Sequence, residues 1–174
     1  MPDVRERVEA DRGLLKKIQL LLPGYAGYRR REDMRAADNI LRMRLGERMK
    51  AVRGQLEEIR DVKSANGRMA GLSSLGNMIF ILEGLEAKVR HAEGGYSGIS
   101  ATIRIEEDEL DRLYEYDYAM LESIEKAAVA VTAIREAGDG RALEASLRAL
   151  RELVGAFEQA WGRRTQIVAG TWVR

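Results

Sequence analysis

Apolar residues recur along this chain at steps of three and four residues, the spacing that places them on one face of an α-helix. The longest such pattern runs from about Arg29 to Val62, and the cleanest one follows Gly140. In that last pattern the apolar positions are Leu143, Leu147, Leu150, Val154, Phe157 and Trp161. The pattern therefore predicts an all-α protein with long amphipathic helices.

Three further helices are predicted from the same spacing and from the breaks between the patterns. We expect a first helix after Pro2, with Asp3 as its N-cap and Pro23-Gly24 at its end. A third helix is expected over 72–89, and a fourth from about Glu106 to Glu136, after a short extended stretch over 101–105. Residues 165–174 favour a short irregular C-terminal tail. The chain is thus predicted to be a helical bundle of about five helices, two of them long.

Composition supports one domain over residues 1–174. The chain is 45% hydrophobic and 33% charged and has only two prolines, which is typical of long helices and allows one hydrophobic core. It contains no cysteine, which excludes disulfide scaffolds, thiolate metal sites and cysteine nucleophiles. No residues suggest a bound cofactor or metal.

Neither a secretory signal nor a transmembrane helix is predicted. Residues 1–17 alternate charged and apolar positions without a continuous apolar stretch. The longest uncharged run, Met69 to Leu82, is shorter than the roughly 20 residues that span a bilayer. We therefore expect a cytoplasmic protein, with that run in a buried core helix.

Two Gly-Tyr-x-Gly motifs, at 24–27 and 95–98, each join one predicted helix to the next. Their glycines permit tight turns, and the tyrosines Tyr25 and Tyr96 can fold back over the core. Alternatively, both loops lie at one end of the bundle and form a tyrosine-lined pocket or a docking surface. Neither motif has the Lys-Ser/Thr pair of a phosphate-binding loop.

These motifs carry a resemblance to a family of uncharacterised bacterial and archaeal all-helical proteins with PGYxGY and GYSG motifs. It rests on the segments PGYAGYRRREDMRAADNILR and GGYSGISATIRIEEDELDRLYEYDYAML, under a third of the chain. The resemblance implies that the two loops and the helices that follow them define the family, and it brings no activity or ligand. This chain has GYSGISATI where the family pattern reads GYSGFFDAV, so an aromatic role there does not carry over.

Charge is divided between the second and fourth helices. Residues 28–53 hold nine basic against four acidic side chains, and residues 105–125 hold nine acidic against one basic. The two helices could neutralise each other side by side, with each exposed pair worth only about 0–1 kcal/mol. Alternatively, the second helix presents a basic face to anionic lipid or to nucleic acid, formed by Arg29, Arg30, Arg31, Arg42 and Arg48. Nucleic acid is disfavoured, because carboxylates interrupt this face and the isoelectric point is near 8.0.

Two acidic residues fall on predicted core faces, where a carboxylate needs a partner. Asp117 follows Leu113, and Asp38 follows Tyr28 and has Arg35 and Arg42 within one helical turn. They could form a structural ion-pair network, for example between Asp117 and an arginine of the second helix. Alternatively, they could line a ligand pocket with the loop tyrosines. The candidate ligand or partner residues are therefore Tyr25, Tyr28, Arg35, Asp38, Tyr96 and Asp117.

No catalytic constellation is evident. The single histidine, His91, lies at the end of the third predicted helix without the Glu-x-x-His spacing of a bundle di-iron site. We therefore expect a non-enzymatic interaction or scaffold protein that acts through helix–helix contacts of the coiled-coil kind, with another protein or with copies of itself. The alternatives are a membrane-surface or nucleic-acid binder and a small-ligand pocket.

Overall fold

The computed structural model describes residues 4–28, 31–92, 107–138 and 140–169. Within these ranges it describes the side chains of all residues except 4–12, 31–35 and 107–108. The described residues form five α-helices and no strand, which confirms the predicted all-α helical bundle. The helices are α1 (Val4–Leu21), α2 (Arg31–Ala65), α3 (Leu72–His91), α4 (Glu107–Glu136) and α5 (Arg141–Val168). The two longest are α2 and α4, as predicted.

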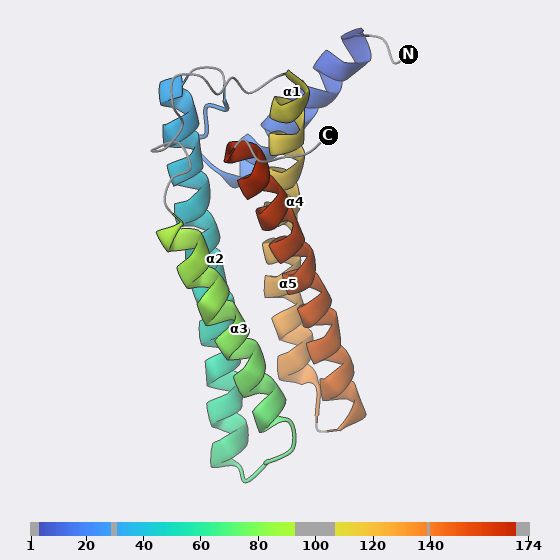
Figure 1. The fold of residues 1–174 in the computed structure, drawn as a ribbon. Coiled ribbons are helices and arrows are strands. Elements are labelled where there is room, and N and C mark those ends of the chain that lie inside the picture. The colour runs from blue at the N-terminus through green and yellow to red at the C-terminus, as the bar shows by residue number, and fades with distance from the viewer. Residues whose placement is uncertain (1–3, 29–30, 93–106, 139, 170–174) are drawn as a thin grey trace.

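Two antiparallel hairpins, α2–α3 and α4–α5, make up the body of the bundle. Figure 1 shows them side by side with both connecting turns at the same end, while α1 lies at the opposite end and packs against α4. The hairpins meet through contacts of α2 with α4 and of α3 with α5. When short turns join helices that run in alternating directions, each helix can bury its apolar stripe in a common core.

The core is one continuous cluster that contains the predicted apolar stripes. Buried residues of α2 follow three- and four-residue steps along its length: Ala37, Leu41, Leu45, Met49, Val52, Leu56 and Ile59. A narrow apolar gap between the hairpins is lined by residues such as Met49, Leu82 and Phe157, and it has no space for even a water molecule. The hairpins are therefore joined by dry packing along their middle.

The C-terminal tail requires a correction. We predicted an irregular tail from Thr165, but α5 continues as a regular helix through Val168, where Ile167 and Val168 are buried. The error arose because Thr, Ile and Val favour strands in isolation, whereas burial against the bundle decides their conformation here. Residues 170–174 and the predicted extended stretch 101–105 lie outside the described residues.

No helix in the part of the chain that the structure describes is long and apolar enough to cross a lipid bilayer. The cytoplasmic location stays a prediction.

Close glycine contacts fix the turn end of the bundle. Gly71, the N-cap of α3, has φ +80°, and a Cβ there would lie 2.3 Å from Cδ2 of the buried Leu143. Gly67 has φ +71° but open space around it. Lys63 of α2 adds a hydrogen bond from its Nζ to the carbonyl oxygen of Gly138, 3.1 Å away, between the two turns.

This difference predicts unequal costs for two glycine substitutions. Gly67→Ala should lower the free energy of unfolding by about 1–2 kcal/mol, because an L-residue is strained in the left-handed region. Gly71→Ala should cost about 1–3 kcal/mol more, because its methyl group also displaces Leu143 from a packed core. Urea denaturation followed by circular dichroism measures both, and equal losses would contradict the proposed contact.

Candidate functional site

The turn after α1 places two tyrosines over the core. Tyr25 N–H donates a hydrogen bond to the carbonyl oxygen of Leu22, and Gly24 and Gly27 have φ of +90° and +82°. Glycine adopts this left-handed conformation at no steric cost, so the chain can reverse within a few residues. Both tyrosine side chains, Tyr25 and Tyr28, are buried, as the first Gly-Tyr-x-Gly motif predicted for Tyr25.

Gly27 is required for a second reason, the approach of Tyr114 from α4. A Cβ at Gly27 would lie only 2.7 Å from the Tyr114 hydroxyl oxygen. That hydroxyl accepts a hydrogen bond from the backbone N–H of Tyr28 at 2.9 Å, and the rings of Tyr28 and Tyr114 lie 5.3 Å apart. The turn is therefore attached to α4 by a hydrogen bond from the Tyr28 backbone to the Tyr114 hydroxyl and by contact between the rings of these two tyrosines.

Asp117 of α4 is the carboxylate that accepts hydrogen bonds at the centre of this end of the bundle. Its side chain is fully buried, and its Oδ2 accepts hydrogen bonds from the Tyr25 hydroxyl at 2.9 Å and from the Tyr28 hydroxyl. Its Oδ1 accepts a hydrogen bond from Nε of Arg164 at 2.7 Å. A carboxylate removed from water is tolerated when donors and a cation replace the water, and here all of them converge on one group.

Arg164 of α5 connects this carboxylate to the second one. Its Nη2 lies 2.7 Å from Oδ1 of Asp38 on α2 and donates to the Tyr28 hydroxyl at 3.1 Å. The residue is only 3% exposed. Its guanidinium carbon lies 5.9 Å from the ring centre of Trp161, one turn earlier in α5. Planar donors on several nitrogens allow one arginine to serve two acids and a hydroxyl.

The contacts between charged side chains extend from Asp38 through Arg42 to the end of α3. Arg42 donates from Nε to Oδ2 of Asp38 at 2.8 Å, and from Nη1 to the backbone carbonyl oxygen of Ala92 at the end of α3. Charges therefore alternate from Asp117 to Arg164, Asp38 and Arg42, which we call the buried charge chain. It has two positive and two negative members, and it links α2, α3, α4, α5 and the turn after α1.

Burial changes the proton affinity of two members of this site. It raises the pKa of Asp117, against the opposing charge of Arg164 and the hydroxyl groups that donate to it. Burial, followed by the charge of Asp117, raises the pKa of Tyr25 far above its usual value of 10.0. The Tyr25 hydroxyl therefore stays protonated and remains a donor over the whole physiological pH range.

The structure brings together four of the six predicted ligand or partner residues: Tyr25, Tyr28, Asp38 and Asp117. Asp38 and Arg42 pair at i and i+4, as the spacing suggested. Tyr96 lies outside the described residues, and the side chain of Arg35 is not described.

Sequence reasoning missed Arg164, which takes the place suggested for an arginine of the second helix. A signal was present, because Arg164 continues the apolar stripe of α5 three residues after Trp161 and four before Val168. We had ended the stripe at Trp161. A charged residue in phase with a core stripe is the mark of a buried ion pair.

The proposed basic face is engaged with carboxylates where its side chains are described. Arg42 binds Asp38, and Arg48 lies 2.9 Å from Glu125 of α4. Arg29 and Arg30 are outside the described residues, and the side chain of Arg31 is not described. Because α2 packs beside α4, this part of the charge division is used within the bundle.

The chemistry of the site is thus that of a closed network. Its donors and acceptors face one another from side chains that are buried, or half-buried in the case of Arg42, which favours the structural interpretation over a ligand pocket. Among the residues that the structure describes, no three histidine or carboxylate side chains gather as ligands of a metal ion would.

Comparison of the chain with models of known protein families, with curated proteins and with solved structures finds no match. The resemblance to a family with PGYxGY and GYSG motifs therefore stays a prediction.

Removal of Arg164 should be among the most costly single substitutions in the bundle. Arg164→Met leaves two buried carboxylates facing each other, and we expect a loss of about 3–5 kcal/mol in the free energy of unfolding. Arg163→Met, at an exposed neighbouring position, should stay within about 0.5 kcal/mol of wild type. Adding Asp117→Asn to Arg164→Met should recover part of the loss, whereas additive losses would show that the two groups are not coupled.

Alkaline pH should weaken the contribution of Tyr25. The unfolded chain releases this hydroxyl proton near pH 10, while the folded chain retains it, so stability is complete below about pH 10 and falls as the pH rises above it. The difference in unfolding free energy between wild type and Tyr25→Phe should therefore shrink by up to about 1.4 kcal/mol per pH unit above pH 10. Denaturation at pH 7, 10 and 11 measures it, and a constant difference would refute the assignment.

Proposed function

We propose that this protein is a non-enzymatic interaction protein that acts through helix–helix contacts, with the outward face of α3 as its contact surface. The observation that carries the proposal is the exposure of Phe80, 75% of whose surface is accessible in the middle of α3. An exposed phenylalanine alone is common on protein surfaces. Its surroundings make it informative.

The outermost row of α3 carries no charge over four turns, and exposed Glu83 and Lys88 flank it. The row consists of Ser73, Asn77, Phe80, Gly84 and Ala87, all of them exposed. The solvent side of a helix in a globular protein normally carries charged and polar residues, so a row with an exposed phenylalanine and no charge is a departure from that pattern. In α3 the opposite side already packs in the core through Leu75, Met78, Leu82 and Leu85. A helix of a binding partner is the element that would best cover the exposed Phe80 on the outward side of α3.

The non-enzymatic part of the proposal is supported by the buried charge chain. Its carboxylates, hydroxyls and guanidinium groups already bind one another, so a substrate would have to break these bonds to reach them. Arg42 and Arg48 likewise give no specific support to the basic-face alternative, since both lie against carboxylates.

A photoreactive phenylalanine analogue placed at position 80 tests the contact surface. Irradiation of cells that make this protein should give one defined, saturable adduct from position 80. The matched control is position 129 on α4, because Val129 has almost the same exposure, 73%. Val129 has two charged residues of its helix on its N-terminal side within one turn, Glu125 and Lys126, whereas the residues of α3 in the turn before Phe80 are uncharged.

A second substitution on the same face makes the result specific. Asn77→Glu introduces a charge one turn from Phe80 without touching the core, and it should abolish the adduct at position 80. No adduct from position 80, or equal adducts from positions 80 and 129, would refute the proposed surface.

A further inference from the structure

The last turns of α1 carry an exposed leucine beside two exposed lysines. Leu20 is 83% exposed, more than any other large apolar side chain that the structure describes. Lys16, Lys17 and Pro23 lie within one helical turn of it in the chain, and all three are exposed. We call these four residues the α1 patch. Ile18, on the opposite side of the helix, is buried in the core, so Leu20 points away from the bundle.

The positive charge of the α1 patch is not neutralised within the bundle. Residues 13–28 contain two lysines and no acidic residue. Neither lysine forms an ion pair with a residue that the structure describes, and Lys17 instead places its Nζ 5.4 Å from the ring centre of Tyr118 on α4. Arg42 and Arg48 of α2, by contrast, lie against carboxylates. The α1 patch is therefore a cationic surface with an apolar side chain at its centre.

The carboxylates of α4 lie behind α1 as seen from outside. Among the described helices α1 contacts α4 alone, and Figure 1 shows it at the end of the bundle. The outward side of α1 therefore stands roughly one helix diameter, about 10 Å, above α4 and its exposed Glu115. This separation exceeds the Debye length of about 8 Å at physiological ionic strength. A flat surface that touches α1 is thus largely screened from the acidic residues of α4.

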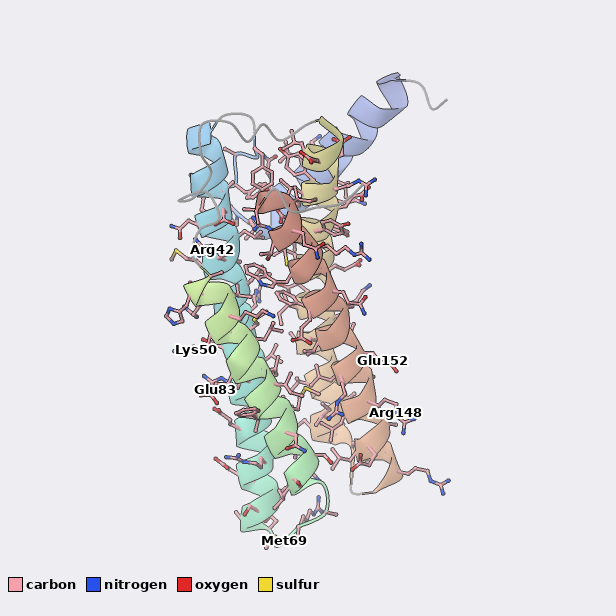
Figure 2. The ribbon with its side chains drawn as sticks, viewed as in Figure 1. Arg42, Lys50, Met69, Glu83, Arg148 and Glu152 are labelled. Atoms are coloured by element: carbon pink, nitrogen blue, oxygen red, sulfur yellow. The ribbon has the colours of Figure 1, made fainter. Side chains whose placement is uncertain are left out.

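The long sides of the bundle present charges of both signs. Figure 2 shows Lys50 and Glu83 along one edge and Arg148 and Glu152 along the opposite edge. A flat anionic surface laid against either edge would meet repulsion as well as attraction. At the α1 patch the same surface would meet two cations and an exposed leucine.

We propose that this protein binds the surface of an anionic lipid bilayer through the α1 patch, with Leu20 inserted at the boundary between headgroups and acyl chains. Lys16 and Lys17 then lie against the lipid phosphate groups. An inserted apolar side chain flanked by lysines is how amphipathic helices lie on membranes. Lysine suits this place because its aliphatic stem can follow the acyl chains while its ammonium group reaches the headgroups. One leucine and two lysines give weak, reversible binding that depends on anionic lipid.

A bilayer fits this patch better than a protein helix or a nucleic acid does. A helix that packs on α1 would need a row of apolar side chains at steps of three and four residues, but Lys16 takes the position one turn before Leu20. A nucleic acid would use the lysines and leave Leu20 in water. Fluid acyl chains, by contrast, close around a single inserted side chain.

Co-sedimentation of the full chain with lipid vesicles tests the proposal. The wild type should sediment with vesicles made of equal parts of phosphatidylserine and phosphatidylcholine, and it should stay in the supernatant with phosphatidylcholine alone. Added salt should release it from the anionic vesicles, because screening weakens the attraction between lysines and phosphates.

Two variants separate the apolar contribution from the charge. Leu20→Ser should raise the apparent dissociation constant for anionic vesicles at least about tenfold, because the inserted side chain is lost. Lys16→Gln combined with Lys17→Gln should also raise it about tenfold or more. Phe80→Ser is the matched control, since Phe80 is 75% exposed on α3, and it should leave vesicle binding unchanged. All four positions are exposed, so circular dichroism should show every variant folded.

A polarity-sensitive fluorescent label tests the insertion directly. The chain has no cysteine, so Leu20→Cys offers a single attachment site. Its emission should shift to shorter wavelength when anionic vesicles are added, whereas the same label at Phe80→Cys should not respond. A response from position 80 without one from position 20 would place α3 on the bilayer and overturn the proposal.

The remaining outcomes are equally decisive. A wild-type chain that stays in the supernatant with anionic vesicles at low salt overturns the proposal. Leu20→Ser binding that equals wild type, with loss only in the lysine variant, would mean a purely electrostatic anion surface and would also overturn it. The vesicle experiments concern α1 and the position-80 adduct concerns α3, so each can fail without the other.

Discussion

A carboxylate that is removed completely from water must find donors inside the protein, and Asp117 finds them in two segments that lie far from it in the chain. The hydroxyls of Tyr25 and Tyr28 arrive from the turn after α1, and Arg164 arrives from α5. Arg164 then binds Asp38, which binds Arg42. Each charge is tolerated because its neighbour is in place, so the network ties α2, α3, α4, α5 and the turn after α1 to one another.

The opposite end of the bundle is held by different means. There Gly71 allows Leu143 to approach the backbone, and Lys63 reaches the carbonyl oxygen of Gly138. Apolar packing without space for water connects the two ends. The polar groups inside one end bind one another, while Phe80 on the outward side of α3 is exposed, and this contrast directs the search for function to a surface rather than to a cavity.

Much of the fold could be predicted because helix phase is a local property. The steps of three and four residues placed α2, α4 and α5, and the same phase showed that Asp38 and Asp117 face the core. The candidate site was predicted less completely. The partner of Asp117 lies 47 residues away in the chain, and no local rule selects Arg164 over the arginines of α2. The helical state of residues 165–168 was missed for a related reason, since burial overrides their strand preference.

The sequence by itself determined the number of helices, their apolar faces, the turn at Pro23-Gly24 and the need of two buried acids for partners. All of these follow from spacing and residue type within a few turns. The tertiary structure alone decided that Tyr25, Tyr28, Arg164 and Asp38 gather around Asp117, that Arg48 lies against Glu125, and that Phe80 faces outward. Such contacts depend on which helices become neighbours, and the free energy that selects neighbours comes from burial summed over the whole bundle.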